Sequence, residues 1–331
     1  FDGTGTLTID PSTIDDAAGL DDSTAFSGIS DGAIENITLT EAEFKALFVT
    51  NPDATANLAK LASGSVTITG QVSDTSVLSV LSANAAKLET GGITDLLLAA
   101  DAAIESYKLL VADDGVSADA ITLTNGAIST SQVTVLANIT KFKANEVDAI
   151  TFDDDAAVQA ASAAIADDAI ADNSITLTDG SITTSQATVL SNITAFKANQ
   201  VTAITFATET DAAAKVADDA FAANSVTLGT DTVTGATVAT IAANITKFVA
   251  GEVDLSLADE AALKLGLDPN GTFLADDAIA NGSIVLTDGT ITAATQTAVL
   301  ASIEKFSAGG ITAITFATET DAAAKVSDDA F

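Results

Sequence analysis

The chain has 331 residues, of which 46 are Asp or Glu and 12 are basic, which gives a formal net charge of −34. Such acidity repels nucleic acid and anionic membranes, so we expect neither as a partner. The absence of His and Cys excludes His-based catalytic triads, thiol nucleophiles and zinc sites built on these residues.

The first sixty residues predict two strands and a loop. The segments "GTLTID" at 5–10 and "ENITLT" at 35–40 have the β-branched composition of strands, and Pro52 marks a loop. Ile29 and Ile34 already show the five-residue spacing that dominates the rest of the chain. We therefore expect residues 1–60 to form irregular versions of the unit that follows.

From residue 61 onward, one pattern recurs about every 27 residues. A bulky apolar residue, the first anchor, is followed five positions later by Val or Ile, the second anchor. Longer echoes show that successive units alternate between two types, and "LGLDPNGTFL" at 265–274 is an insertion. The anchor pairs are Leu61–Val66, Leu88–Ile93, Val116–Ile121, Phe142–Val147, Ile170–Ile175, Phe196–Val201, Phe221–Val226, Phe248–Val253, Ile279–Ile284 and Phe306–Ile311.

Each unit is predicted to contain one amphipathic helix before its first anchor. In "SQATVLSNITAF" at 185–196, Thr184 or Ser185 can cap the helix start. The apolar stripe has the three-residue spacing of a helix face. It consists of Ala187, Leu190, Ile193 and Phe196.

A turn and a strand follow. Asn or Gly between the anchors indicates a residue in the left-handed region that ends the helix. The β-branched runs "ITLT" at 175–178 and "VTAITF" at 201–206 predict strands.

These elements predict an α/β repeat solenoid. Identical strand–turn–helix units of about 27 residues wind in one direction and stack, because crossovers between parallel strands are right-handed. We expect one continuous parallel sheet with a row of helices beside it. Residues 61–331 would form the regular solenoid, with the insertion at 265–274, after irregular units in residues 1–60.

Pairs of Asp residues recur in every second unit and are the candidate metal ligands. If the helix runs to the first anchor, both carboxylates sit in its last turn, where the helix dipole disfavours anions and bound Ca²⁺ would relieve the repulsion. The alternative is a solvated acidic surface, which the missing dense Asp loop favours. The candidates for calcium are Asp113, Asp114, Asp167, Asp168, Asp218, Asp219, Asp276, Asp277, Asp328 and Asp329.

Thr-x-Thr motifs are the second candidate feature. They place two hydroxyls on one strand face and predict a Thr-lined sheet that could bind ice or glycan, although exposed Thr is common on any sheet. The motifs are at 6–8, 38–40, 67–69, 122–124 and 176–178.

No pattern predicts catalysis. Carboxylates are plentiful, but the sequence distinguishes no acid from a base among them, and Tyr107 and Lys108 are more simply an irregular unit. The longest apolar runs, such as "LLLAA" at 96–100, fall far short of the roughly 20 residues that span a membrane. We expect no enzyme and no membrane insertion.

The segments "AADAAIESYKLLVADDGVSADAITLTNG" and "ITAITFATETDAAAKVADDAF" resemble the Ala-, Thr- and Asp-rich repeats of very large secreted surface proteins of cyanobacteria and other marine bacteria. The resemblance covers residues from about 61 to the end. It implies an extracellular or cell-surface location and a structural or adhesive role, often with calcium.

The expected function is therefore structural, as part of a surface filament, surface layer or adhesin stalk. The final "KVSDDAF" matches "KVADDAF" ending at Phe221, where the chain continues into a strand. We expect either a segment of a longer repeat protein or a subunit that stacks head-to-tail on copies of itself, with other surface proteins as further partners.

Overall fold

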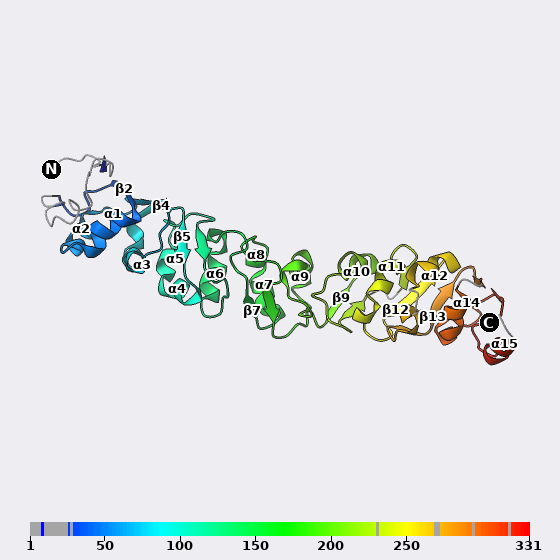
Figure 1. Ribbon diagram of the computed structural model, residues 1–331. Coiled ribbons are helices and arrows are strands. Elements are labelled where there is room, and N and C mark those ends of the chain that lie inside the picture. Colours follow the sequence, from blue (N-terminus) through cyan, green and yellow to red (C-terminus); the bar gives the residue numbers. More distant parts are fainter. Residues whose placement is uncertain are drawn as a thin grey trace. The chain divides into compact units, whose positions relative to one another are not determined.

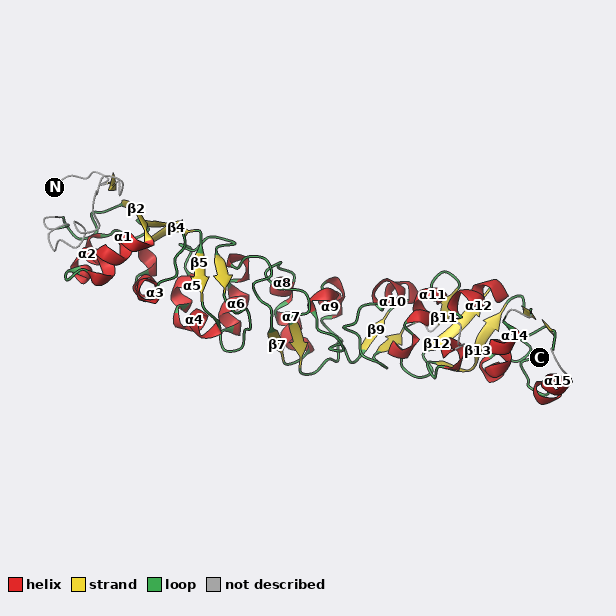
Figure 2. Cartoon of the chain, in the orientation of Figure 1, coloured by secondary structure: helices red, strands yellow, loops and turns green. Residues whose placement is uncertain are grey.

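The computed structural model describes residues 8–9, 26, 29–229, 232–267, 272–292, 295–316 and 319–331. The protein is a mixed α/β chain in which short helices alternate with short parallel strands (Figures 1 and 2). Its contacts group into two compact units. Unit 1 contains residues 1–151 and 161–175, and unit 2 contains residues 152–160 and 176–331.

Unit 1 contains two parallel sheets in its described part, with the strand orders β1-β2-β3-β4 and β5-β6. The strands are β1 (Thr8–Ile9), β2 (Asn36–Thr40), β3 (Val66–Thr69), β4 (Leu88–Ile93), β5 (Leu96–Leu98) and β6 (Ile121–Leu123). The helices are α1 (Glu41–Lys45), α2 (Ala54–Lys60), α3 (Thr75–Ala83), α4 (Asp101–Ser106), α5 (Lys108–Ala112), α6 (Gln132–Ala137) and α8 (Ser162–Ile165).

Unit 2 contains parallel sheets with the orders β10-β9, β11-β12-β13 and β14-β15 in its described part. The strands are β9 (Ile204–Phe206), β10 (Val226–Leu228), β11 (Thr232–Thr234), β12 (Val253–Leu257), β13 (Ile279–Leu286), β14 (Thr290–Ile291) and β15 (Ala313–Ile314). The helices are α7 (Asp155–Ala160), α9 (Gln186–Ser191), α10 (Glu209–Lys215), α11 (Val238–Ala243), α12 (Glu260–Gly266), α13 (Thr272–Ala275), α14 (Gln296–Ala301) and α15 (Glu319–Lys325). The remaining strands, β7 (Ile150–Phe152) and β8 (Ile175–Leu177), each contain residues of both units.

The five-residue anchor spacing produces a tight corner with a left-handed residue three positions after the first anchor. Asn and Asp tolerate this conformation better than other residues with side chains, and Gly adopts it freely. The predicted left-handed turn is therefore confirmed. The corner residues with positive φ are Gly64, Gly91, Asp119, Asn145, Asn173, Asn199, Asn224, Gly251, Gly282 and Gly309, with Gly32 between Ile29 and Ile34.

Successive repeats, each counted from one first anchor to the next, are joined in a fixed register. The second anchor of one repeat forms a parallel bridge with the first anchor of the next, so the backbone groups at each corner find partners in the neighbouring repeat. These bridges join Ile34 to Leu61, Ile93 to Val116, Ile121 to Phe142, Val147 to Ile170, Val201 to Phe221, Val226 to Phe248 and Ile284 to Phe306. The same pairing within strands joins Val66 to Leu88 and Val253 to Ile279.

The anchors also form the core. Phe142, Phe196, Phe221, Phe248 and Phe306 are all at most 1% exposed. Burying a side chain of this size stabilises a fold by about 1.5–3 kcal/mol. The repeating spacing therefore places one large apolar residue at the interior corner of each of these repeats.

Two predictions about these elements need correction. The described strands form short separate sheets rather than one continuous sheet, and β4 and β13 shift register between the anchors. The helix expected over 185–196 ends at Ser191 and is followed by a 3₁₀ turn at Ile193–Ala195. Consequently Ala187 is exposed, and Val189 takes its place in the buried stripe with Ile193 and Phe196.

The sequence predicted irregular repeats in residues 1–60 and regular repeats in residues 61–331, and this division stays a prediction. Much of residues 1–28, and residues 268–271 of the insertion at 265–274, lie outside the described residues. Within the insertion, Phe273 and Leu274 of α13 are buried.

Candidate functional site

The Asp pairs lie just beyond the helix ends, not in the last helical turn that the sequence suggested. In α5, for example, the helix ends at Ala112 and Asp113 is its C-cap. The first Asp of each pair forms an Asx turn, in which one carboxylate oxygen accepts from the N–H two residues on. These bonds join Asp113 to Gly115 (2.9 Å), Asp167 to Ala169 (3.1 Å), and Asp218, Asp276 and Asp328 to Ala220, Ala278 and Ala330 (3.0 Å each).

The second Asp of each pair uses its backbone. Its carbonyl oxygen accepts from the N–H of the left-handed residue near the start of the same repeat, at 2.8 Å in every case, while its side chain is exposed. The pairs thus join the end of a repeat to the corner at its start, directly beside the boundary with the next repeat. The bonds join Gly91 to Asp114, Asn145 to Asp168, Asn199 to Asp219, Gly251 to Asp277 and Gly309 to Asp329.

The geometry accounts for the Asp pairs without a metal. Within the described part of the chain, no group of three or more Asp or Glu side chains is arranged to hold a metal ion, whereas Ca²⁺ takes six to eight oxygen ligands. Calcium binding at these pairs stays a prediction.

A second set of carboxylates makes the most extensive polar contacts in the described chain, and sequence reasoning missed it. Asp101, in the first turn of α4, reaches the residues just before α6 in the next repeat. Its Oδ1 accepts from the N–H (2.9 Å) and the Oγ (2.5 Å) of Ser131, and its Oδ2 accepts from the N–H and Oγ1 of Thr130 (2.7 Å each) and from Ser129 (2.8 Å). One carboxylate thereby satisfies unpaired N–H groups at the start of α6.

Asp155 repeats this arrangement within unit 2. Its Oδ2 accepts from the N–H and Oγ1 groups of Thr183 and Thr184, and its Oδ1 accepts from the N–H and hydroxyl of Ser185. The predicted cap of α9 by the side chain of Thr184 or Ser185 is therefore wrong. Ser185 is the N-cap residue but makes no side-chain cap, and the hydroxyls of Thr184 and Ser185 both donate to the Asp155 carboxylate.

Three Glu residues occupy the same place in other repeats. Glu41 Oε1 accepts from the N–H groups of Ser73 and Asp74 at 2.6 Å each. Glu260 Oε1 accepts from the N–H of Thr292 at 3.0 Å and from the hydroxyls of Thr292 and Thr295. Glu209 accepts from the hydroxyls of Thr234 (2.7 Å) and Thr237 (3.4 Å). We call the five residues Glu41, Asp101, Asp155, Glu209 and Glu260 the carboxylate clips.

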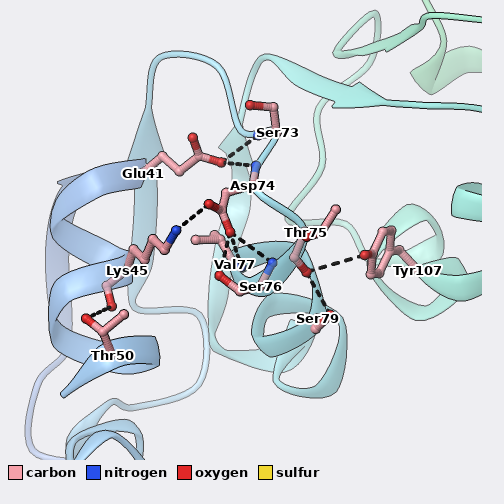
Figure 3. Close-up of polar contacts among 10 residues, drawn as sticks. All are labelled: Glu41, Lys45, Thr50, Ser73, Asp74, Thr75, Ser76, Val77, Ser79 and Tyr107. Atoms are coloured by element: carbon pink, nitrogen blue, oxygen red, sulfur yellow. Dashed lines mark hydrogen bonds and ion pairs between the residues drawn. The ribbon is translucent and has the colours of Figure 1, made fainter.

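The first clip is part of a larger network (Figure 3). Asp74 caps α3 by accepting from the N–H groups of Ser76 (2.9 Å) and Val77 (3.3 Å), and its Oδ2 pairs with Lys45 Nζ at 2.5 Å. The hydrogen bond from Lys45 leads the effects that hold the pKa of Asp74 well below its ordinary value. Glu41 and Lys45 of α1 thus hold the start of α3 from two sides.

Lysines bind the opposite helix end at the same repeat boundaries. The ammonium Nζ of Lys141 donates to the carbonyl oxygens of Val111 (2.8 Å) and Asp113 (2.6 Å), at the end of α5. A cation is favoured there because the last carbonyls of a helix are unpaired and partly negative. Equivalent bonds run from Lys87 to Leu61, from Lys247 to Val216 and Asp218, and from Lys305 to Asp276 and Ile279.

Three of the clips, Asp101, Asp155 and Glu260, stay ionised at acidities where ordinary carboxylates do not. Desolvation raises the pKa of Asp101, but the hydrogen bonds from Ser131 and Thr130 together outweigh it and leave the pKa well below its usual range. The pKa values of Asp155 and Glu260 are likewise lowered, against desolvation, by their Ser and Thr donors. At neutral pH Asp101, Asp155 and Glu260 therefore each carry a negative charge between two helix starts, where the helix dipoles favour it.

The Thr-lined surface is present only in short stretches. Thr38 lies beside Thr67, and Thr40 beside Thr69, in the pairing of β2 with β3. Elsewhere Thr122 lies beside Leu97, and the Thr67 hydroxyl donates to Glu89 at 2.7 Å. Of the motif at 6–8, residues 6 and 7 lie outside the described residues. Binding of ice or glycan stays a prediction.

Tyr107 separates α4 from α5, and Lys108 is the first residue of α5. The Tyr107 hydroxyl donates to the carbonyl of Thr75 at 3.3 Å, and Lys108 pairs with Glu105 at 2.7 Å. These contacts are those of an irregular repeat.

No protein family, no curated protein and no solved structure matches the chain. Among the described residues, the helices are all too short or too polar to cross a bilayer.

Proposed function

We propose that the chain is an α/β solenoid of about 27-residue repeats that serves as a structural segment of an extracellular surface filament, surface layer or adhesin stalk. The observation that carries this proposal is the recurrence, within each unit, of the same junction between neighbouring repeats. Each junction combines an anchor-to-anchor bridge with a left-handed corner residue.

The distribution of these contacts favours a mechanical role. In the described chain, the anchor bridges, the clips and the contacts of Lys141 and Lys247 all join neighbouring repeats. In a repeat protein, stability is a sum of such neighbour contacts, so load is shared along the stack. We propose no enzymatic role, and we propose copies of the chain or other surface proteins as partners, through stacking of repeats.

The acidic surface suits an extracellular protein in salt water. The net charge of −34 makes separate chains repel one another. In physiological salt, charges that lie more than about 8 Å apart are largely screened, which weakens the repulsion within a stack. An exposed location is therefore compatible with this charge.

Negative-stain microscopy and small-angle scattering of the purified chain test the proposal. A compact protein of this length has a radius of gyration of about 20 Å, and we expect a clearly larger value together with elongated particles. Fibres would support stacking of copies. A compact particle with a radius of gyration near 20 Å would refute the solenoid. The surface location is tested by adding protease to intact native cells, and it would be refuted if the protein were not cleaved.

A further inference from the structure

The carboxylate clips are confined to one kind of repeat boundary. Each clip residue lies in the first turn of one helix, as in α1, α4, α7, α10 and α12, and reaches the start of the helix in the following repeat. The contacted helices are α3, α6, α9, α11 and α14. Because clipped and contacted repeats alternate, every second boundary has a clip.

The intervening boundaries are packed differently. α3 contacts α5, and α11 contacts α12. A pocket of about 200 Å³ between α3, β5 and α4 is lined by Leu78, Leu97 and Ala103 among others, and a pocket of about 210 Å³ lies at the equivalent boundary of α9, β9 and α10. Two of the polar contacts at these boundaries, from the N–H of Leu123 to Glu146 (2.6 Å) and from the N–H of Leu177 to Gln200 (2.7 Å), involve strand residues and not a helix start.

We propose that the clips Asp101, Asp155 and Glu260 make their repeat boundaries acid-labile, so that acid releases the starts of α6, α9 and α14 while the intervening boundaries, which have no clip, stay closed. This proposal does not depend on an extracellular role, because it follows from the hydrogen bonds of the clips alone.

The chemistry of one clip explains the lability. Asp155 is surrounded by donors only, since the N–H and hydroxyl groups of Thr183, Thr184 and Ser185 all point to its two oxygens. A proton on either oxygen adds one more donor to this set, removes the negative charge that strengthens each bond, and ends the favourable interaction with the helix dipole.

Few other charges face the clips. Glu41 shares its site with Lys45 and Asp74, and Lys264 lies near Glu260 on the same helix. The groups that hold Asp101 and Asp155 ionised are hydroxyl and amide donors. Further acids lie close to the clips in sequence, namely Glu105 on α4, Asp154 before α7 and Asp211 on α10.

The direction of the effect follows from the lowered pKa values. A carboxylate whose pKa is lower in the folded than in the unfolded state contributes stability above the unfolded value, near 4. That contribution is lost progressively as the pH falls below about 4 toward the folded pKa. Release therefore belongs to distinctly acid conditions and is absent at neutral pH.

Hydrogen exchange of the whole chain, corrected for the intrinsic effect of pH on exchange, tests the proposal. Between about pH 7 and about pH 2.5 we expect protection at residues 130–137 and 184–191 to fall at least about tenfold, the factor that corresponds to 1.36 kcal/mol. Residues 108–112 of α5, which pack against α3, should keep their protection. Equal loss everywhere, or unchanged protection at the clipped helix starts, would overturn the proposal.

Two variants separate the clip from general acid effects. In Asp101→Asn, residues 130–137 should be weakly protected already at neutral pH, as they are in the unaltered chain in acid. Acidification should then cause no further loss of protection. Asp114→Asn, which removes an exposed carboxylate at a corner, should behave as the unaltered chain. If Asp101→Asn does not fold, the pH series on the unaltered chain decides alone.

Discussion

The backbone N–H of Asn199 donates to the carbonyl oxygen of Asp219 at 2.8 Å, and Asn199 has a φ of 59°. A residue in this left-handed conformation turns the chain so that its N–H points to the end of the same repeat, two residues before the next first anchor. The same relationship joins Asn145 to Asp168. The corner of one repeat is therefore bonded directly beside the boundary with the next repeat.

We expect Asn199→Val to destabilise the chain by about 1–2 kcal/mol, the cost of the left-handed conformation for an ordinary L-residue and more for a β-branched one. Asn199→Gly should stay within about 0.5 kcal/mol of the unaltered chain. Urea unfolding measures both, and Ala198→Val, at the exposed preceding residue, is the matched control. Equal costs for the Val and Gly variants would contradict the role of the backbone conformation.

Gly180→Ala should be among the most damaging single-methyl additions. A Cβ at Gly180 would overlap the carbonyl oxygen of Gln200, and Gly126 and Gly289 face the same obstacle from Glu146 and Gly310. Backbone cannot move aside cheaply, so we expect a loss of about 2 kcal/mol or more. Gly235→Ala, where the nearest atom would lie at 3.4 Å, is the control and should leave the thermal unfolding midpoint nearly unchanged.

The anchors and corners could be predicted because each is a local signal. The bulky residue at Phe196, the Asn at 199 and the Val at 201 lie within six residues, and only a tight left-handed turn suits all three. The apolar stripe of α9 was placed wrongly near Ala187, because the helix ends at Ser191 and continues as a 3₁₀ turn with a different period.

The clips could not be predicted, because their partners lie about thirty residues apart in sequence. Ser185 before an apolar run has the composition of an ordinary N-cap. A signal was nevertheless present in the longer period. An acid at the start of one helix, at Asp101 and Asp155, precedes a Ser/Thr cluster before the next helix, at 129–131 and 183–185.

Lys247→Met should destabilise the chain by about 1.5–3 kcal/mol, the range for hydrogen bonds made by a charged group. The variant keeps the apolar stem but leaves the carbonyl oxygens of Val216 and Asp218, each 2.7 Å from Nζ, without this donor. Lys197→Met is the control, because the Lys197 ammonium makes no hydrogen bond or ion pair with the described residues. Equal effects in chemical unfolding would show that the loss of positive charge, rather than the helix-end contact, is responsible.

The Asp pairs offer a test that separates a turn from a calcium site. Asn forms the same Asx turn as Asp, so Asp218→Asn should stay within about 0.5 kcal/mol of the unaltered chain, whereas Asp218→Ala loses the bond to the Ala220 N–H and should cost about 1 kcal/mol.

Unfolding measured with calcium and with chelator completes this test. A purely structural turn responds to neither, and the order of the variants stays the same in both conditions. If Asp218 and Asp219 bind calcium, the ion stabilises the folded chain by mass action, and both Asp218→Asn and Asp219→Asn abolish the difference between calcium and chelator. Because the Asp219 side chain is exposed and only its backbone serves the corner, a calcium-dependent loss in Asp219→Asn would be decisive for the metal.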